Sequence, residues 1–174
     1  VAEIAQTPGV KIGCIARLSE QKGLPYLIQA MSLMTNPSVS LFIVGDGELR
    51  NDLINQTKEL NLEDRILFFG YRSDVVECIN SFDFLVSSSL YEGLALNVIE
   101  TFMNGKTMVA TDIPGIKEIV NDSNGILVPV KDPKALAQAI EELAGNPEKR
   151  ASLATQAKRD YESFCTRYFK RATL

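Results

Sequence analysis

The sequence predicts an α/β fold: a Rossmann-like, doubly wound parallel six-stranded sheet with helices on both faces. Short apolar runs alternate with longer segments whose apolar residues recur at helical spacing, which is the pattern of strand–helix–strand units. The short runs, such as Leu41–Val44, are apolar throughout, as expected of strands that helices cover on both sides. The length of 174 residues, without an internal repeat, indicates one domain that spans residues 1–174.

The first third of the chain predicts two strands and two helices. Lys11–Ala16 is a mainly apolar run and forms the first strand. Leu24–Met34 carries apolar residues at the i, i+3, i+4 and i+7 positions of a helix. Ser40–Val44 is the second strand, which Gly45-Asp46-Gly47 ends. A second helix over 48–60 places its leucines on one side.

The middle of the chain repeats this alternation. Ile66–Phe69 is a third strand that ends before a glycine, and a short helix is predicted over 73–81. Phe82–Ser87 is a fourth strand, and a helix over 96–103 leads to a fifth strand at 107–111. Parallel strands in this order need right-handed crossovers, which the helices provide.

The last third predicts one strand and three helices. A helix of one to two turns is expected over 116–120, before a sixth strand at 125–128. The helix over 133–144 has proline in its first turn and glycine just after its end, which is the preferred polarity of these residues. A final helix runs from Glu148, with Pro147 in its starting turn, toward the C-terminus. Its apolar residues Phe164, Tyr168 and Phe169 are expected to be partly exposed.

Composition excludes several classes of function. Hydrophobic residues make up 45% and charged residues 23% of the chain, as in a globular domain. The net charge of -4 argues against nucleic-acid binding, which needs a basic face. No apolar run approaches the roughly 20 residues of a membrane span. The chain has no histidine, which excludes Ser-His-Asp and Cys-His catalysis and most zinc sites.

The cysteines indicate a reducing compartment. Cys14, Cys78 and Cys165 are odd in number and far apart, so they form neither a disulfide framework nor a metal cluster. Cys14 and Cys78 lie in apolar stretches and are interpreted as buried structural thiols. Because the chain begins at Val1 and shows no signal peptide, we expect it to be cut from a longer protein.

Ligands of doubly wound sheets bind outside the carboxyl ends of the strands, where the strand order reverses. The polar and glycine-containing segments at these ends are therefore the candidates for chemistry. They are 17–23, 45–47, 70–73, 87–93 and 111–115.

Two carboxylates, Glu92 and Glu100, have seven residues between them. A carboxylate can accept two hydrogen bonds from the vicinal hydroxyls of a ribose or hexose. The backbone amides near Leu96 and Asn97 lie at a predicted helix start, which favours a phosphate. The alternative is that Glu92 is a solvated loop residue and Glu100 a surface residue of the helix.

Two cations, Arg17 and Lys22, follow the first strand. Together they could clamp a diphosphate, and Gly23 permits close backbone approach at the next helix start. The alternative is a solvated loop.

The remaining candidates are weaker. The Gly45-Asp46-Gly47 turn does not continue into a dinucleotide fingerprint, because Arg50 stands where the third glycine is needed. Tyr71 and Arg72 could flank a planar base, although loop structure alone would explain them. Asp112 and Glu118 could meet at the end of the fifth strand, unless Asp112 caps a helix.

Taken in order, these residues resemble the carboxyl-terminal, donor-binding half of group 1 (family four) glycosyltransferases, which have the two-domain GT-B architecture. The motifs are Arg17 with Lys22, the segment from Gly45 to Arg50, Phe69-Gly70, and Glu92 with Glu100. The resemblance is clearest from Val10 to Arg150. The chain departs from the family's usual residues at Ala95, Thr101-Phe102, Thr107 and Pro114.

The resemblance implies a transferase that uses a nucleotide-diphosphate sugar in glycan or polysaccharide biosynthesis and retains the anomeric configuration, as is typical of the family. It implies Arg17, Lys22 and Glu92 as catalytic residues: the cations hold the diphosphate, and Glu92 contacts the transferred sugar. It implies that Glu100 binds the ribose and that the Tyr71-Arg72 segment borders the base. The implied donor-binding residues are Arg17, Lys22, Gly23, Gly45, Tyr71, Arg72, Gly93, Leu96, Asn97 and Glu100.

The resemblance also implies what surrounds this domain. A glycan or lipid-linked acceptor would bind an N-terminal domain that this chain lacks, so the chain alone is expected to be inactive. No metal or other cofactor is expected, and no nucleic-acid partner. The expected location is the cytoplasm, with peripheral association of the full enzyme at the inner membrane face left open. The alternatives are a stand-alone, non-catalytic nucleotide-sugar-binding module and, less well supported without histidine, a related epimerase or phosphorylase.

Overall fold

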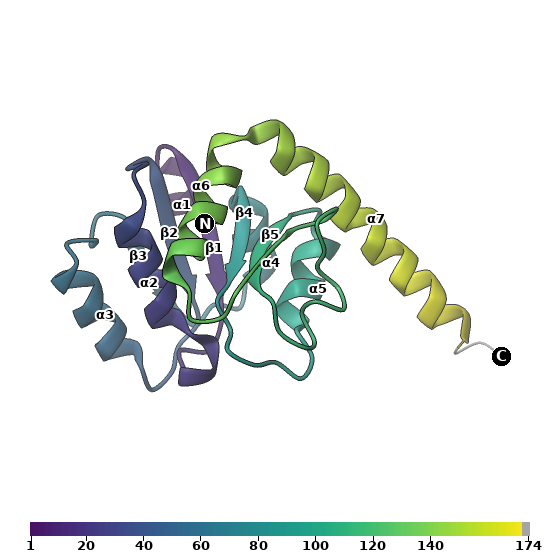
Figure 1. Cartoon of the computed structure of the whole chain (residues 1–174), viewed down its shortest axis with the longest axis horizontal. Coiled ribbons are helices and arrows are strands. Elements are labelled where there is room, and N and C mark those ends of the chain that lie inside the picture. Colours follow the sequence, from purple (N-terminus) through teal and green to yellow (C-terminus); the bar gives the residue numbers. More distant parts are fainter. Residues whose placement is uncertain (172–174) are drawn as a thin grey trace.

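The computed structural model describes the backbone of residues 1–171 and the side chains of residues 1–165. Its centre is a six-stranded, all-parallel sheet in the order β3-β2-β1-β4-β5-β6 (Figure 1). The predicted doubly wound sheet is therefore confirmed. Its strands are β1 (Val10–Ile15), β2 (Val39–Val44), β3 (Ile66–Gly70), β4 (Phe84–Ser87), β5 (Met108–Thr111) and β6 (Ile126–Val128).

The helices lie on both faces of this sheet, and most of them match the periodicity of the sequence. Two short elements, α1 and the 3-10 helix η1, were not predicted, since five and three residues are too few to show a period. The elements are α1 (Ala2–Gln6), η1 (Glu20–Lys22), α2 (Leu24–Leu33), α3 (Arg50–Glu59), α4 (Val75–Ser81), α5 (Leu96–Met103), α6 (Pro133–Gly145) and α7 (Pro147–Arg171).

The helix predicted over 116–120 is wrong. The segment forms consecutive turns instead. The amide of Ile119 bonds to the carbonyl of Ile116, an i to i−3 bond, while only Lys117 and Val120 make i to i−4 bonds. A helix needs such bonds in succession. Ile116 and Val120 are nevertheless buried. Their spacing, which serves packing against the core, is the same as the spacing of apolar residues on one face of a helix.

Alternation along the strands divides the core into two layers. In β2, Leu41 and Ile43 pack with α2, α3 and α6, while Phe42 and Val44 pack on the opposite face with α1, α4 and α5. The helix α7 contributes Leu153 to the first layer and Ala157 to the second. Both faces of the sheet are thus covered, which explains why its strands are apolar throughout.

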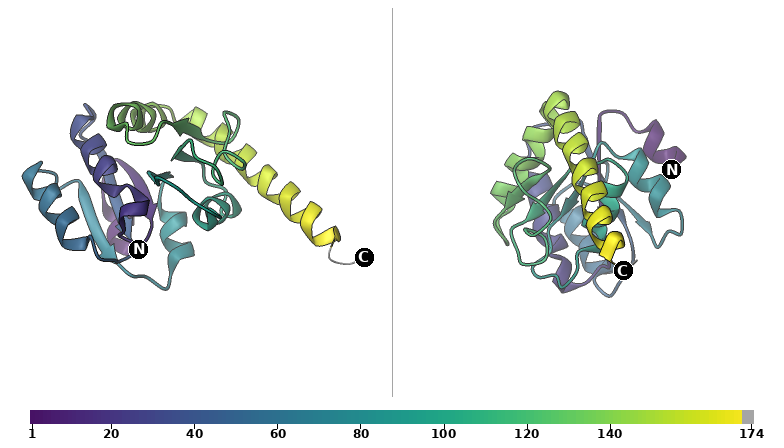
Figure 2. Two further views of the ribbon diagram at one scale, coloured as in Figure 1. Left: turned by 60° about the horizontal axis from the view of Figure 1, so that its bottom comes forward. Right: turned by 90° about the vertical axis from the view of Figure 1, so that its right-hand side faces the viewer.

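The helix α7 extends away from the rest of the chain toward the C-terminus (Figures 1 and 2). Phe164 on this helix is 43% exposed, which confirms the prediction for that residue. The side chains of Tyr168 and Phe169, which carried the same prediction, lie outside the described residues. None of the helices described over residues 1–171 has the length and apolar character needed to cross a bilayer.

The strand order reverses between β1 and β4. From β1 the chain proceeds outward through β2 to β3, and then returns to place β4 on the other side of β1. Residue Ile12 of β1 is in register with Leu41 of β2 on one side and with Phe84 of β4 on the other. The helices that follow β1 and β4, which are α2 and α5, pack on opposite faces of the sheet. The carboxyl edge at this reversal point is where ligands of such sheets bind.

Burial makes the Cys14 thiol unreactive. Cys14 lies in β1, 2% exposed, and burial raises the pKa of its thiol to about 12, since the thiolate is the form that loses solvation. At pH 8 the thiolate is therefore almost absent, and we expect Cys14 to resist a thiol reagent in the native chain. Labelling with Ellman's reagent before and after denaturation checks this, with the partly exposed Cys165 as the reactive control. Fast modification of native Cys14 would contradict it.

Candidate functional site

A cleft of about 450 Å³ lies at the carboxyl edge of the sheet, at the reversal point between β1 and β4. It collects residues from the ends of β1, β2 and β3, from the loop after β4 and from the start of α5. Most of the predicted donor-binding residues line it, although they are far apart in sequence. These are Arg17, Lys22, Gly45, Tyr71, Arg72, Glu92, Leu96 and Asn97.

The loops that follow β1 and β4 are joined by their backbones. The amide of Leu90 donates to the carbonyl of Gln21 at 2.8 Å, and the hydroxyl of Ser88 donates to the carbonyl of Lys22 at 2.9 Å. Gly23 has φ 59°, and a Cβ at this position would lie 2.2 Å from the carbonyl oxygen of Ser88. Glycine is thus needed here for close packing of the two loops. Its predicted contact with a donor stays a prediction.

Lys22 and Glu92 form an ion pair inside the cleft. The Nζ of Lys22 contacts Oε1 of Glu92, and their side chains are only 19% and 6% exposed. Ser89 Oγ donates to the same Oε1 at 2.8 Å, and Gln21 Nε2 lies 3.4 Å from Oε2. The carboxylate is therefore held by donors from both loops. The predicted roles of Lys22 in binding the diphosphate and of Glu92 in contacting the sugar stay predictions.

Further cations line the outer part of the cleft. Arg17 pairs with Glu48 at 3.3 Å, but both side chains are mostly exposed, so the pair adds little energy and leaves the guanidinium able to turn. Arg72 is held by Asp74 through Nε at 2.7 Å and also through Nη2. Hydrogen bonding to Arg72 lowers the pKa of Asp74, so this fork stays charged near neutrality. Tyr71 is 82% exposed beside it.

The floor of the cleft depends on close approach of two backbones. Gly45 ends β2 with φ 134°, a conformation that favours glycine, and a Cβ there would lie 2.0 Å from the carbonyl oxygen of Ala16. The amide of Gly45 donates to the carbonyl of Gly70 at 2.8 Å. The backbones at the ends of β1, β2 and β3 therefore lie close together at this point, where Gly45 contributes no side chain to the cleft floor.

The start of α5 faces the same cleft. Leu96 and Asn97 are its first residues and line the cleft, and the residue before the helix, Ala95, offers no side-chain cap. The amides of Leu96 and Val98 already donate to the carbonyls of Leu94 and Ala95, both at 3.0 Å, so an incoming phosphate would compete with these bonds. Glu100 is exposed and does not line the cleft. It lies one turn beyond Leu96 along α5, and its predicted contact with the ribose stays a prediction.

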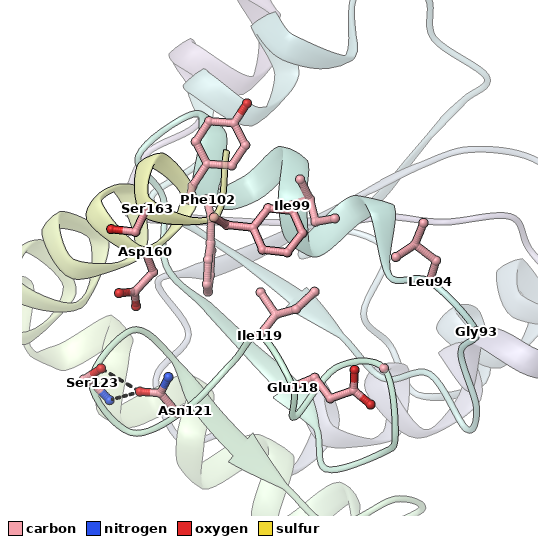
Figure 3. A pocket seen from close by; sticks show the side chains of 13 residues that line it. Gly93, Leu94, Ile99, Phe102, Glu118, Ile119, Asn121, Ser123, Asp160 and Ser163 are labelled. Atoms are coloured by element: carbon pink, nitrogen blue, oxygen red, sulfur yellow. Dashed lines mark hydrogen bonds between the residues drawn. The ribbon is translucent and has the colours of Figure 1, made fainter. Parts of the chain in front are cut away.

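A second, larger hollow of about 600 Å³ lies between α5, the turns near 115–119 and α7 (Figure 3). Its inner side chains are apolar, with Ile99, Phe102 and Ile119 facing the space in Figure 3. Gly93, a predicted donor-binding residue, lines this hollow and not the cleft. No lysine or arginine is among its described lining residues, so it lacks the cations that a diphosphate needs.

The pair Asp112 and Glu118 is not part of the cleft. Asp112 lies 3.7 Å from Lys117 at exposed positions, and no helix begins there for it to cap, so the capping alternative is wrong. Glu118 lines the second hollow.

Sequence reasoning missed the residues that support Glu92. Gln21 and Ser89 lie inside the predicted segments 17–23 and 87–93, but nothing in the sequence distinguishes them from their neighbours. Thr111, which donates to the carbonyl of Ser89 at 2.5 Å, was also missed. The available signal was general, namely a polar residue at the carboxyl end of a strand.

Known proteins match this chain in both sequence and fold. The sequence model described as "Glycosyl transferases group 1" matches residues 4–160. The lipopolysaccharide core biosynthesis glycosyltransferase LpsE of Rhizobium meliloti is 30% identical over 159 residues, which are 91% of this chain and 45% of LpsE. A UDP-Gal:alpha-D-GlcNAc-diphosphoundecaprenol alpha-1,3-galactosyltransferase of Escherichia coli is 32% identical over 72% of this chain and 34% of its own length.

Solved structures show the same fold. HepE of Anabaena in complex with UDP superposes with a TM-score of 0.87 at 27% identity, over 93% of this chain and 46% of HepE. Its complex with UDP-glucose superposes with a TM-score of 0.86. This chain spans less than half the length of each of these relatives.

Proposed function

This chain belongs to the group 1 glycosyltransferases, and we propose that it binds a nucleotide-diphosphate sugar in the cleft between β1 and β4. The observation that carries the proposal is the convergence of Arg17, Lys22 and Glu92 on that cleft from two loops about 70 residues apart. A double negative charge and a polyhydroxyl ring are the groups that such a set recognises. The binding of UDP and UDP-glucose by HepE supports this choice of ligand.

Different residues of the cleft bind different parts of the donor. Lys22 and Arg17 hold the diphosphate and stabilise the negative charge that grows on it as the sugar leaves. The amides near Leu96 and Asn97 add phosphate contacts from the start of α5. Glu92 accepts hydrogen bonds from hydroxyls of the transferred sugar.

The remaining predicted residues bind the nucleoside part of the donor. Glu100, one turn beyond Leu96 on α5, binds the ribose hydroxyls from outside the residues that line the cleft. Tyr71 and Arg72 border the base at the outer end of the cleft, where the tyrosine ring is exposed. Gly45 keeps the cleft floor open.

We propose that sugar transfer needs a second domain besides residues 1–174. In this proposal residues 1–174 form the donor domain and the further domain binds a glycan or lipid-linked acceptor. The relative named as a galactosyltransferase of GlcNAc-diphosphoundecaprenol supports a lipid-linked acceptor. The chain alone should then bind donor without transferring sugar. Retention of the anomeric configuration is proposed from family membership, and proton NMR of the product of the complete enzyme tests it. A product of opposite configuration would refute that part.

We place the reaction in the cytoplasm, which the three unpaired cysteines support. A lipid-linked acceptor would bring the complete enzyme to the inner membrane face.

We expect the diphosphate to bind without a metal ion, because Lys22 and Arg17 already supply positive charge at the cleft. Titration of UDP in the presence of EDTA, and again in excess Mg²⁺, should give dissociation constants within about twofold of each other, a difference of only ~0.4 kcal/mol. Loss of binding in EDTA, restored by Mg²⁺, would contradict this expectation.

Calorimetric titration of UDP, GDP and ADP tests the proposed function. We expect one nucleotide to bind, Glu100→Ala to weaken the nucleoside and Arg17→Ala to weaken the diphosphate more than the monophosphate. If none of the three nucleotides binds, the proposal fails. If binding survives both substitutions unchanged, the assigned roles are wrong. A complete enzyme that binds donor but transfers no sugar would instead favour a non-catalytic binding module.

A further inference from the structure

The carboxylate of Glu92 is held by Lys22, which lines the cleft, and by Ser89 and Gln21, which do not. Its Oε1 accepts from Ser89 Oγ at 2.8 Å and also contacts the Nζ of Lys22. Its Oε2 lies 3.4 Å from Gln21 Nε2, a longer and weaker contact. Ser89 is therefore the strongest neutral donor to this carboxylate among the described residues.

Ser89 is itself held in place. It is 1% exposed at the end of β4, and its carbonyl accepts from Thr111 Oγ1 at 2.5 Å, which ties it to the end of β5. Its hydroxyl lies 3.3 Å from that of Ser87, which is 3% exposed. The hydroxyl has no room to move to solvent, so it presents a fixed donor to Glu92.

We propose that Ser89 is a positioning residue for sugar recognition: it fixes the Glu92 carboxylate when Lys22 turns from Glu92 to the diphosphate. The inference rests on the proposed function. Lys22 and Ser89 share one carboxylate oxygen, and an arriving diphosphate competes for the lysine. Once the lysine turns, Ser89 and Gln21 are the donors that keep the carboxylate aimed at the sugar hydroxyls. Ser89 thus affects binding of the sugar and does not affect the contacts to the nucleotide.

Ser89→Ala tests this, with Ser88→Ala as the matched control. Ser88 is in the same loop and 3% exposed, but its hydroxyl bonds to the Lys22 carbonyl and not to a carboxylate. The measured quantity is the ratio of the affinity for a nucleotide sugar to that for its free nucleoside diphosphate. The probes are UDP-glucose, GDP-mannose and ADP-glucose with UDP, GDP and ADP.

We expect Ser89→Ala to lower this ratio by about three- to tenfold, because the lost bond is to a charged group but acts indirectly. Ser88→Ala should leave the ratio unchanged. In a Glu92→Gln background, Ser89→Ala should have little further effect on the ratio, because both changes act through one carboxylate. A merely structural role of Ser89 would instead give additive effects in that background.

The outcomes separate the two proposals. If no probe binds the unsubstituted chain, the proposed function fails and the positioning role fails with it. If a probe binds and Ser89→Ala behaves as Ser88→Ala does, only the positioning role is overturned. If Ser89→Ala does not fold, Ser89→Cys decides, since it keeps the volume with a weaker donor. A lowered ratio for this variant supports the role, and an unchanged ratio overturns it.

Discussion

Replacing Lys22 by methionine is expected to weaken binding of the nucleoside diphosphate by about 10- to 100-fold. This factor corresponds to the usual free energy of a hydrogen bond to a charged group. Methionine keeps most of the volume of the side chain but removes the ammonium that faces the cleft beside Glu92. The corresponding monophosphate should lose much less, because its single phosphate can still use Arg17 and the start of α5. Calorimetric titration of both nucleotides measures the difference.

The same substitution should also destabilise the fold. Glu92, 6% exposed, would be left without its cation, and breaking a buried pair costs about 3–5 kcal/mol. Because Lys22 is 19% exposed, solvent screens part of this interaction. We therefore expect the free energy of unfolding, measured with urea, to fall by about 2 kcal/mol. Adding Glu92→Gln should restore much of the stability but none of the diphosphate affinity.

Lys117→Met is the matched control for Lys22→Met. Lys117 pairs with Asp112 at 3.7 Å, but both side chains are more than half exposed, so its loss should cost less than about 1 kcal/mol. It does not line the cleft, and nucleotide binding should be unchanged. Equal losses of monophosphate and diphosphate affinity in Lys22→Met would contradict the assigned role of the lysine.

Gly45→Ala should destabilise the chain and close the cleft at its floor. The added Cβ would lie 2.0 Å from the carbonyl oxygen of Ala16, and alanine would have to adopt φ 134°. Strain and overpacking together should cost about 2–5 kcal/mol, which corresponds to a melting temperature about 5–15 °C lower. Relief of the clash must separate the ends of β1 and β2, so nucleotide affinity should fall as well. Thermal unfolding and nucleotide titration measure the two effects.

Gly145→Ala serves as the control for this change. Gly145 ends α6 and does not have a positive φ, and a Cβ added there would meet no other part of the described chain within 4 Å. Alanine is the better helix former, so this variant should be as stable as the unsubstituted chain or slightly more so. If Gly45→Ala melted at the same temperature as Gly145→Ala and bound nucleotide normally, the close approach at the cleft floor would be refuted.

Most of the fold could be predicted because its signals are local. Leu24–Leu33 and Pro133–Gly145 carry a helical period, and the strands are short, mainly apolar runs such as Val39–Val44. The order of the strands follows once they are parallel and joined by right-handed crossovers. The segment near 116–120 was predicted wrongly because buried Ile116 and Val120 have helical spacing without helical hydrogen bonds.

The candidate site was predictable in position but not in its internal contacts. Arg17, Lys22 and Glu92 stand out because charged residues follow apolar strands, and strand topology brings these ends together. The support of Glu92 by Ser89, and of Ser89 by Thr111, depends on hydrogen bonds within the loop after β4 and between that loop and the end of β5. Serine is too common in loops for the sequence to single out one hydroxyl.

Amide NMR during titration with UDP, GDP and ADP tests the central claim most directly, because it reports where a nucleotide binds. We predict that the effective nucleotide shifts the amides of residues 16–23 and 92–97 and leaves those that line the second hollow near 119–123 unchanged. Shifts confined to 119–123 and α7, or no shifts with any of the three nucleotides, would contradict the account.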